Sequence, residues 1–291
     1  MFSETPANAN DDPLSLARIR LTYLWRHGRL PNLSNPKLFT ELVQARKLRD
    51  RDHRMPGMAD KVAVKNLVAD RLGSQWVIPL LWSGSSLPDH PQWEGPIVVK
   101  SRHGCNQNAF VSDPSADWQN VRSRSANWMR QTYGRWLDEW LYTEIPRGLL
   151  VEPHIGVGSK LPIDYKFYVF DGRVSHVQVH LDRAEKHRWT AFDTNWKPIS
   201  NAGQEIARPS ALKDMIAGAE DLARGFSFAR VDFYQPSRQP LFGEICFYPG
   251  SGLDPFDPAS LDAELGDLWL NAGGTRLAAK AANPALNPTV A

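Results

Sequence analysis

The first quarter of the chain has the spacing of apolar residues that is typical of helices. Residues 14–27 place Leu16, Ile19, Leu21, Tyr23 and Leu24 at helical intervals, and Gly28 follows as a stop signal. Further helices are expected over residues 36–49, with Asn35 as N-cap, and over residues 58–72, 115–141, 211–224 and 261–270. The pattern therefore predicts a helical start and a later mixture of elements.

Short β-branched and apolar runs predict strands in the middle and the last third of the chain. Asp171-Gly172 lies between two such runs and is a strong signal for a hairpin turn. The strands are expected over residues 97–100, 108–112, 149–152, 164–171, 173–181, 189–193, 228–234 and 241–247. Helices followed by hairpin-connected strands indicate an α+β fold rather than a parallel βαβ series, with a domain boundary near residue 147.

Composition narrows the class of protein. The 291 residues contain 34 Lys and Arg against 32 Asp and Glu, a net charge of +2, which argues against a protein that coats nucleic acid. Two cysteines cannot build a disulfide scaffold or a four-cysteine zinc site. No run approaches the ~20 apolar residues that a membrane helix needs. The polar residues 1–13 resemble no secretory signal, so we expect a disordered leader and a cytoplasmic protein without membrane insertion.

Two sets of polar residues on predicted strands are candidates for chemistry. Lys100 ends a strand and precedes a polar turn, where it could meet phosphate oxygens or simply close the strand. Asp164, Lys166 and Tyr168 share one face of their strand because side chains alternate. That face either binds a ligand or is exposed to solvent.

A third set is the most informative. Arg230 and Asp232 share one strand face, and Glu244 comes beside Asp232 if the two strands form a hairpin. Two converging carboxylates suit Mg²⁺, particularly where phosphates complete its shell. The alternative is an Arg–carboxylate network without a metal, and spacing alone does not separate the two.

The order of these motifs resembles the ATP-grasp superfamily, and more narrowly the TupA-like ATP-grasp proteins of cell-surface polysaccharide biosynthesis. The resemblance covers residues 36–266 and rests on Asp60-Lys61, Val98-Val99-Lys100, Val151-Glu152, Asp164-Tyr165-Lys166, Arg230-Val231-Asp232, Gly243-Glu244 and Tyr248-Pro249-Gly250. It implies two α+β subdomains that hold ATP between them, over residues 76–147 and 148–272. An N-terminal helical segment (1–75) would precede them and a tail (273–291) would follow.

The resemblance also implies roles for single residues. Lys61 and Lys100 would contact the ATP phosphates, with His103 and Gly104 in the loop over them. Glu152 would belong to the hinge that holds adenine, and Asp164 would lie near the ribose with Lys166 close by. Asp232 and Glu244 would hold Mg²⁺, and Arg230 would stabilise an acyl-phosphate.

The implied activity is an ATP-dependent carboxylate–amine ligase that acts on a small molecule or a glycan, such as a uronic acid or an amino acid. A sugar kinase on the same fold and a non-catalytic nucleotide- or glycan-binding protein are the alternatives. One position departs from the family. Cys246 stands where many ATP-grasp ligases have a metal-binding Asn, and a thiol is a poor Mg²⁺ ligand. Either a second ion is missing or another group supplies its oxygen.

Overall fold

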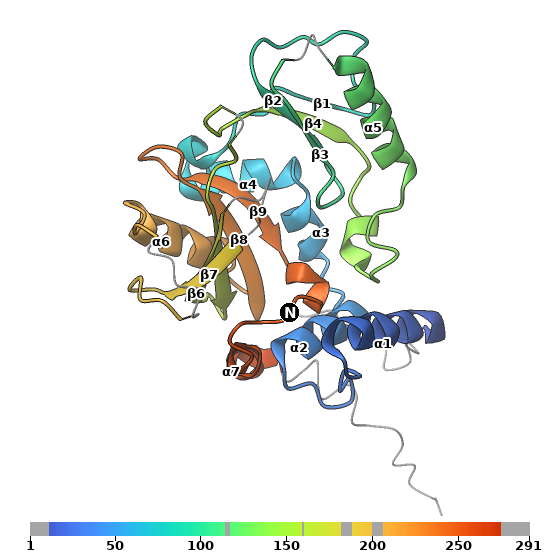
Figure 1. Ribbon diagram of the computed structural model, residues 1–291, viewed down its shortest axis with the longest axis vertical. Helices are drawn as coiled ribbons and strands as arrows, with labels where there is room; N and C mark the ends of the chain where they lie inside the picture. Colours follow the sequence, from blue (N-terminus) through green and yellow to red (C-terminus); the bar gives the residue numbers. More distant parts are fainter. Residues whose placement is uncertain (1–11, 114–116, 159, 182–187, 200–205, 275–291) are drawn as a thin grey trace, which may run out of the picture.

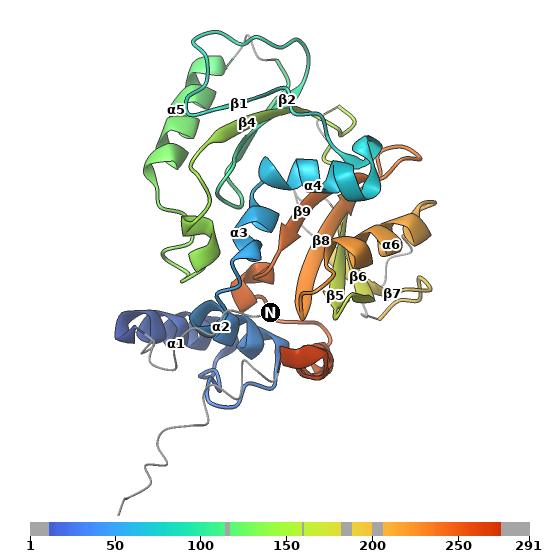
Figure 2. The ribbon, with the colours of Figure 1, turned by 180° about the vertical axis from the view of Figure 1, so that it is seen from behind.

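The computed structural model describes residues 12–113, 117–158, 160–181, 188–199 and 206–274. Most of the expected leader and tail, and residues 185–187 of a charged cluster, lie outside the described residues. Figures 1 and 2 show a small sheet covered by α5 and a larger sheet covered by α6. Helices α1, α2 and α7 are grouped at one end.

The small sheet consists of four antiparallel strands in the order β1-β4-β2-β3. Its strands are β1 (Trp82–Gly84), β2 (Ile97–Ser101), β3 (Asn108–Val111) and β4 (Leu149–Pro153). Helix α5 (Trp118–Arg130) packs on one face, where Trp118 and Val121 meet the apolar residues of β2 and β4. The opposite face carries Lys100 and Glu152, because side chains alternate along each strand.

The large sheet has five antiparallel strands in the order β7-β6-β5-β8-β9. Its strands are β5 (Asp164–Phe170), β6 (Arg173–Leu181), β7 (Arg188–Asp193), β8 (Phe228–Tyr234) and β9 (Leu241–Cys246). The expected hairpin turn joins β5 to β6, with Asp171 at φ 47° and Gly172 at φ 72°. Both values lie in the left-handed region that this kind of two-residue turn requires.

Helix α6 (Leu212–Leu222) covers one face of the large sheet, and the other face is left for the site described below. Phe167 and Phe233 of the covered face are fully buried, and the rings of Trp76 and Phe233 meet edge to face. The small 3₁₀ helix η1 (Ser74–Trp76) and helix α4 (Ala63–Leu72) bring Trp76 and Leu72 to this face. Fully apolar packing on one side leaves the polar residues of the sheet on the other.

The helices at the two ends of the described chain form one layer. These are α1 (Pro13–His27), α2 (Phe39–Arg49) and α7 (Ser260–Trp269). The short helix α3 (Arg54–Ala59) follows α2 in the chain. The Thr40 backbone N–H and hydroxyl both donate to the carboxylate of Asp262 on α7. Buried Arg46 donates to the carbonyl of Phe228 and lies over the ring of Trp269 at 4.4 Å. Helix α2 therefore joins α7 and the large sheet. Three 3₁₀ or π turns complete the described elements: η2 (Trp140–Thr143), η3 (Pro249–Gly252) and η4 (Leu270–Gly274).

The α+β class is confirmed, and the structure differs from the expected elements in several places. The helix expected over residues 36–49 begins at Phe39 with Leu38, not Asn35, as N-cap, because the Glu41 carboxylate accepts from the Lys37 and Leu38 N–H groups. The helix expected over residues 58–72 is broken, because the Asp60 carboxylate accepts from the backbone N–H groups of Val62 and Ala63 and starts α4 anew. The helix expected over residues 115–141 ends at Arg130. Of the apolar residues at helical intervals on the first helix, only Ile19 and Tyr23 are buried.

The expected boundary at residue 147 stays a prediction, but strand pairing bears on it. Strand β4 begins at Leu149 and pairs with β1 and β2, so it belongs to the small sheet. Residues just past the expected boundary therefore complete the first sheet rather than open the second.

Candidate functional site

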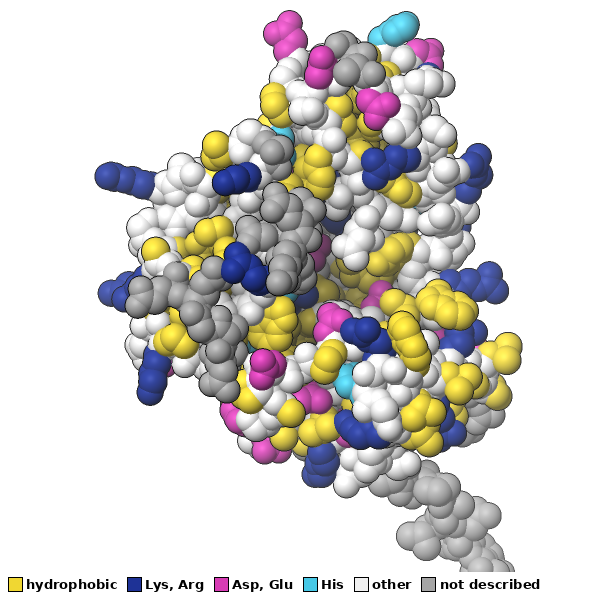
Figure 3. Space-filling model, viewed as in Figure 1, with side chains coloured by type: hydrophobic (Ala, Val, Ile, Leu, Met, Phe, Trp, Pro, Cys, Tyr) yellow, Lys and Arg dark blue, Asp and Glu magenta, His cyan; other side chains and the backbone are white. Residues whose placement is uncertain are grey.

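A cavity of about 700 Å³ lies between the free faces of the two sheets. Figure 3 shows the hollow at the centre of the molecule's face. All the site residues expected from the sequence line this cavity, except His103: they are Lys61, Lys100, Gly104, Glu152, Asp164, Lys166, Arg230, Asp232 and Glu244. Residues from both sheets and from the polar turn after β2 thus line one cavity.

The large sheet brings a line of charges to the cavity through its strand register. Asp232 lies opposite Lys166 on β5 and opposite Glu244 on β9. The Lys166 ammonium donates to Asp232 at 2.5 Å and to Asp164 at 2.6 Å. Arg230 donates through Nε to one Asp232 oxygen at 2.7 Å and bridges to Glu244 at 2.9 Å. Asp232 therefore lies between two cations.

These ion pairs change the pKa values of the groups that form them. Burial alone would raise the pKa of the Asp232 carboxyl, but Arg230 and Lys166 outweigh it and hold that pKa below its ordinary value. Burial and the nearby Arg230 favour neutral Lys166, yet Asp164 and Asp232 raise the pKa of the Lys166 ammonium. The Asp232 carboxylate and the Lys166 ammonium therefore both stay charged at neutral pH.

The small sheet carries a matching arrangement around Glu152. Its carboxylate accepts from Lys65 of α4 and from Lys100 of β2, each at 2.6 Å. Burial favours a raised pKa for Glu152, but the two ammonium groups lower it below the ordinary value. Burial lowers the pKa of Lys65, whose ammonium also donates to the carbonyl of Ile78. One wall of the cavity is therefore cationic and rigidly held.

The polar turn after β2 is fixed by contacts to the helices. The Lys61 ammonium donates to the carbonyl of Gly104, and Arg102 forms a two-pronged ion pair with Asp60. His103 lies outside the cavity and is buried, with its Nδ1 3.4 Å from the backbone nitrogen of Gly148. Burial lowers the pKa of His103, so it stays neutral. We therefore assign His103 to the support of the turn rather than to ligand contact.

Several residues that line the cavity were given no role from the sequence, among them Lys65, Glu139, Tyr142 and Ser251. Lys65 follows Lys61 by one helical turn, which is the one signal that could have identified it. Tyr142 lies in η2, and its hydroxyl is 3.0 Å from the Cys105 thiol. Ser251 comes from the turn after β9 and interacts with Glu139 and with Lys47 of α2. Only the fold brings these segments together.

The chemistry of the carboxylates fits a Mg²⁺ ion. Mg²⁺ in proteins is often held by one or two carboxylates, with substrate phosphates and waters completing its shell. Asp232 and Glu244 are such a pair, side by side on β8 and β9. Among the residues that the structure describes, no group of three or more His, Cys, Asp or Glu could hold a metal by itself. A metal held by this pair would take its remaining oxygens from phosphate or water.

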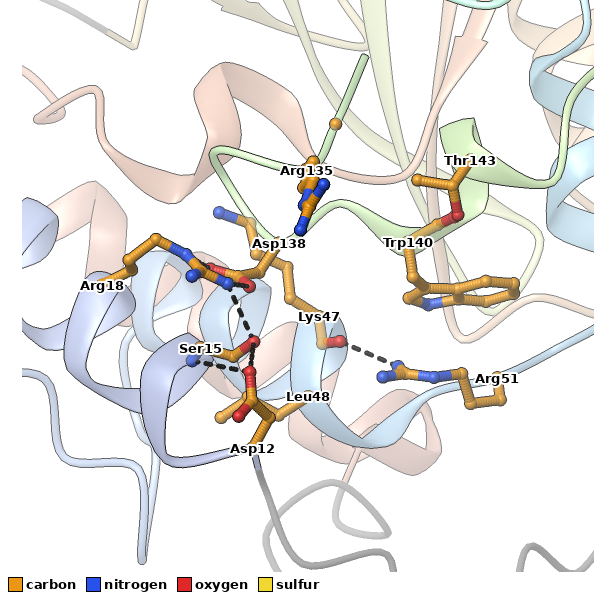
Figure 4. A pocket seen from close by; sticks show the side chains of 11 residues that line it. Asp12, Ser15, Arg18, Lys47, Leu48, Arg51, Arg135, Asp138, Trp140 and Thr143 are labelled. Carbon is orange, nitrogen blue, oxygen red and sulfur yellow. Dashed lines mark hydrogen bonds and ion pairs between the residues drawn. The ribbon is translucent and has the colours of Figure 1, made fainter. Parts of the chain in front are cut away.

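A second pocket of about 370 Å³ lies between the start of α1, the end of α2 and residues 134–143. Figure 4 shows Arg18 and Asp138 facing each other across it, and Arg51 beside the ring of Trp140. The two oxygens of Asp138 accept from Arg18 at 2.5 and 3.2 Å. Because residues 134–143 also form a wall of the main cavity, this ion pair ties α1 to that wall.

Comparison with known proteins gives one family match. The model of the TupA-like ATP-grasp family matches residues 41–270. No curated protein matches.

Solved structures are similar at low identity. They include D-alanine–D-alanine ligase from Bacillus anthracis in complex with ATP (14% identity, 77% of this chain and 68% of that chain, TM-score 0.44). The VanG D-Ala:D-Ser ligase from Enterococcus faecalis gives 12% identity over 75% of this chain and 61% of that chain, with a TM-score of 0.43. The ATP-grasp ligase PsnB with minimal precursor, Mg and ADP gives 14% identity over 75% and 60%, with a TM-score of 0.42. The assignment of the chain to a family depends on the family match alone.

Proposed function

Because the chain belongs to the TupA-like ATP-grasp family, we propose that it joins a carboxylate to an amine in the cavity between its two sheets. Family membership confirms the resemblance seen in the sequence, the α+β ATP-grasp fold and an ATP-grasp enzyme. We also propose that the ligase uses ATP with Mg²⁺, since Asp232 and Glu244 lie side by side in the cavity. The finer proposal is that the carboxylate belongs to a uronic acid or an amino acid, in the making of a cell-surface polysaccharide.

The observation that carries the proposal is the pair of charge clusters on opposite walls of one cavity. Lys65 and Lys100 on one side, and Lys166 and Arg230 on the other, provide cations for a polyphosphate. Asp232 and Glu244 would hold Mg²⁺, which supplies neutralisation of phosphate charge when bound. Charge on both walls suits a ligand that bridges them.

The residues have distinct tasks in the proposed reaction. The substrate carboxylate attacks the terminal phosphorus of ATP, which gives an acyl-phosphate and ADP. An amine then attacks the acyl carbon, loses a proton and displaces inorganic phosphate, which leaves an amide. Arg230 and Lys166 neutralise charge on the transferred phosphoryl group, and Lys61 holds the turn at Gly104 over the phosphates. The protein thus works by position and charge.

A thermal shift experiment tests the nucleotide site. ATP with Mg²⁺ should raise the melting temperature by several degrees, because a ligand that binds only the folded state stabilises it. Asp232→Asn and Glu244→Gln should lose the Mg²⁺-dependent part of the shift. The matched controls are Asp214→Asn and Glu264→Gln, which change exposed carboxylates on α6 and α7. Absence of any shift with ATP, with or without Mg²⁺, would refute the proposed site.

Isotope transfer separates a ligase from a kinase. The substrates are a uronic acid labelled with ¹⁸O in its carboxylate and a mixture of amino acids. An acyl-phosphate route then moves one labelled oxygen into inorganic phosphate. A sugar kinase would instead yield a phosphorylated sugar and no labelled phosphate. A protein that binds ATP and forms neither product from these mixtures would contradict the proposed reaction while leaving the nucleotide site intact.

A further inference from the structure

Helix α1 has two apolar faces, and only one of them is covered. Ile19 and Tyr23 face the protein and are 2% and 0% exposed. On the opposite side Leu14, Leu21 and Trp25 are 69%, 65% and 79% exposed. At about 100° per residue these three fall within roughly 40° of one another, so they form one line along the helix. The apolar side chains of a surface helix normally face the core, whereas this second row is exposed.

We call this line, with Leu24 beside it at 40% exposure, the α1 apolar stripe. Figure 3 shows yellow side chains gathered over the place where Figure 1 draws α1, with dark blue side chains among them. Isolated apolar residues on a surface are ordinary, whereas a continuous row of large ones indicates a contact surface.

The helix that carries the stripe is firmly attached. Besides the Arg18–Asp138 ion pair, the hydroxyls of Tyr23 and Thr40 lie 2.8 Å apart, and His27 Nε2 is 3.1 Å from the carbonyl of Gly252. Asp12 caps the start of the helix by accepting from two backbone N–H groups. The exposure of the stripe is therefore a fixed property of the fold and not the fraying of a helix end.

Arginine side chains surround the stripe, and three of the four are paired with carboxylates. Residues 13–30 contain four arginines and no acidic residue. Arg18 and Arg20 flank the stripe on its two sides, and Arg20 makes no ion pair with a described residue. The side chains of Arg26 and Arg29 stay 39% and 42% exposed although they contact Asp254 and Glu41. The outward surface of α1 thus combines leucines, a tryptophan and guanidinium groups.

We propose that the α1 apolar stripe lies on the surface of a membrane that contains anionic lipids. Leucine and tryptophan side chains can enter the boundary between headgroups and acyl chains while arginines pair with lipid phosphates. No described helix is long and apolar enough to cross a membrane, so α1 would lie flat. A second copy of the chain is a poorer occupant, because a symmetric contact through this face would bring its arginines against each other.

The position of the stripe gives the contact a consequence for the site. Trp25 of the stripe and the adjacent Arg26 line the main cavity. A membrane bound at α1 would therefore lie beside the opening of that cavity. This inference does not depend on the proposed reaction and would hold for any ligand of the cavity.

Vesicle sedimentation tests the proposal on the full chain. The protein should bind vesicles of equal parts phosphatidylglycerol and phosphatidylcholine, and bind vesicles of phosphatidylcholine alone at least tenfold more weakly. Leu21→Ser should weaken binding roughly tenfold through lost apolar contact, and Arg20→Glu should weaken it and reduce its dependence on salt. The matched controls are Leu268→Ser and Phe110→Ser, which remove side chains that are 42% and 51% exposed elsewhere.

Three outcomes would overturn the proposal. Absence of binding to the anionic vesicles is the first, and equal weakening by the control variants is the second. The third is a dimer, seen by analytical ultracentrifugation, that Leu21→Ser dissociates without a change in vesicle binding. Circular dichroism of each variant shows that the fold is retained, and the ATP-induced thermal shift should persist in Leu21→Ser, which separates this proposal from that of the nucleotide site.

Discussion

Two carboxylates at the centre of the cavity each lie between two cations. Glu152 on β4 holds Lys65 and Lys100, and Asp232 on β8 holds Arg230 and Lys166. Buried charges are costly unless they are paired, so removal of either carboxylate leaves cations without compensation. The same groups that would bind phosphates therefore also stabilise the empty cavity.

Glu152→Gln should lower the free energy of unfolding by about 3 kcal/mol, because Lys65 is then buried without its charged partner. Urea unfolding measures this value. Glu144→Gln, which changes an exposed carboxylate a few residues away, is the control and should have little effect. An equal effect of the two substitutions would show that the ion pairs contribute little.

Lys47 predicts a dependence of stability on pH. Burial lowers the pKa of its ammonium from 10.5 to about 8 in the folded protein. Between these values the unfolded chain binds more protons than the folded one, so stability rises with pH. Relative to Lys47→Met, the wild type should gain about 3 kcal/mol from pH 8 to pH 10.5 and change little below pH 8. A difference that is flat across this range would contradict the assignment.

For single residues, the sequence predicts that the charged side chains of the two sheets belong to the site, because strand alternation and motif order place them on one face. It assigns no role to Lys65, because that role depends on Glu152 far along the chain. Nor does it reveal that His103 points away from the cavity, because that depends on the packing of Gly148 against it.

The elements that were predicted best are those whose signals are local. The hairpin at Asp171-Gly172 and strand β8 have the expected bounds or lie within a residue of them. The break between α3 and α4 was missed. The Asp60 carboxylate makes it by accepting from the Val62 and Ala63 N–H groups, and Arg102, 42 positions further along, holds that carboxylate in place. The local pattern of residues predicts that an element forms, whereas its exact ends also depend on contacts with distant residues.

The turn between β5 and β6 gives a prediction at this scale. Gly172→Ala should destabilise the protein by about 1 kcal/mol, because its φ of 72° disfavours any residue with a Cβ. A Cβ at Gly172 would meet no atom within 4 Å, so the cost is conformational alone. Gly57→Ala in helix α3, where the space is equally open, should leave stability unchanged or slightly higher. Thermal unfolding of both variants checks the pair, and an equal effect would refute the explanation.

At the scale of the whole molecule, the fold places both cysteines in the lining of one cavity. Cys105 follows β2 and Cys246 ends β9, and both line the cavity. Burial raises the pKa of the Cys105 thiol to about 11 and raises that of Cys246 further. Both thiols should therefore react slowly even in the free protein.

MgATP should slow alkylation of these thiols by iodoacetamide several-fold, because the nucleotide would fill the space between them. Mass spectrometry of Cys105→Ser and Cys246→Ser shows which thiol is protected, and unfolded protein gives the unprotected rate. If MgATP leaves both rates unchanged, the nucleotide does not occupy this cavity.

The contacts of helix α2 also have a consequence for biosynthesis. Arg46 reaches a carbonyl 182 residues further along the chain, and Thr40 reaches a carboxylate 222 residues further. A ribosome that adds ~5–20 residues per second needs roughly 10 to 40 s to cover such a distance. Throughout that time Phe39 and Leu42 lack the residues that bury them in the folded protein. Helix α2 therefore leaves the ribosome well before the segments that bury it, and until they follow its apolar side chains are open to binding by a chaperone.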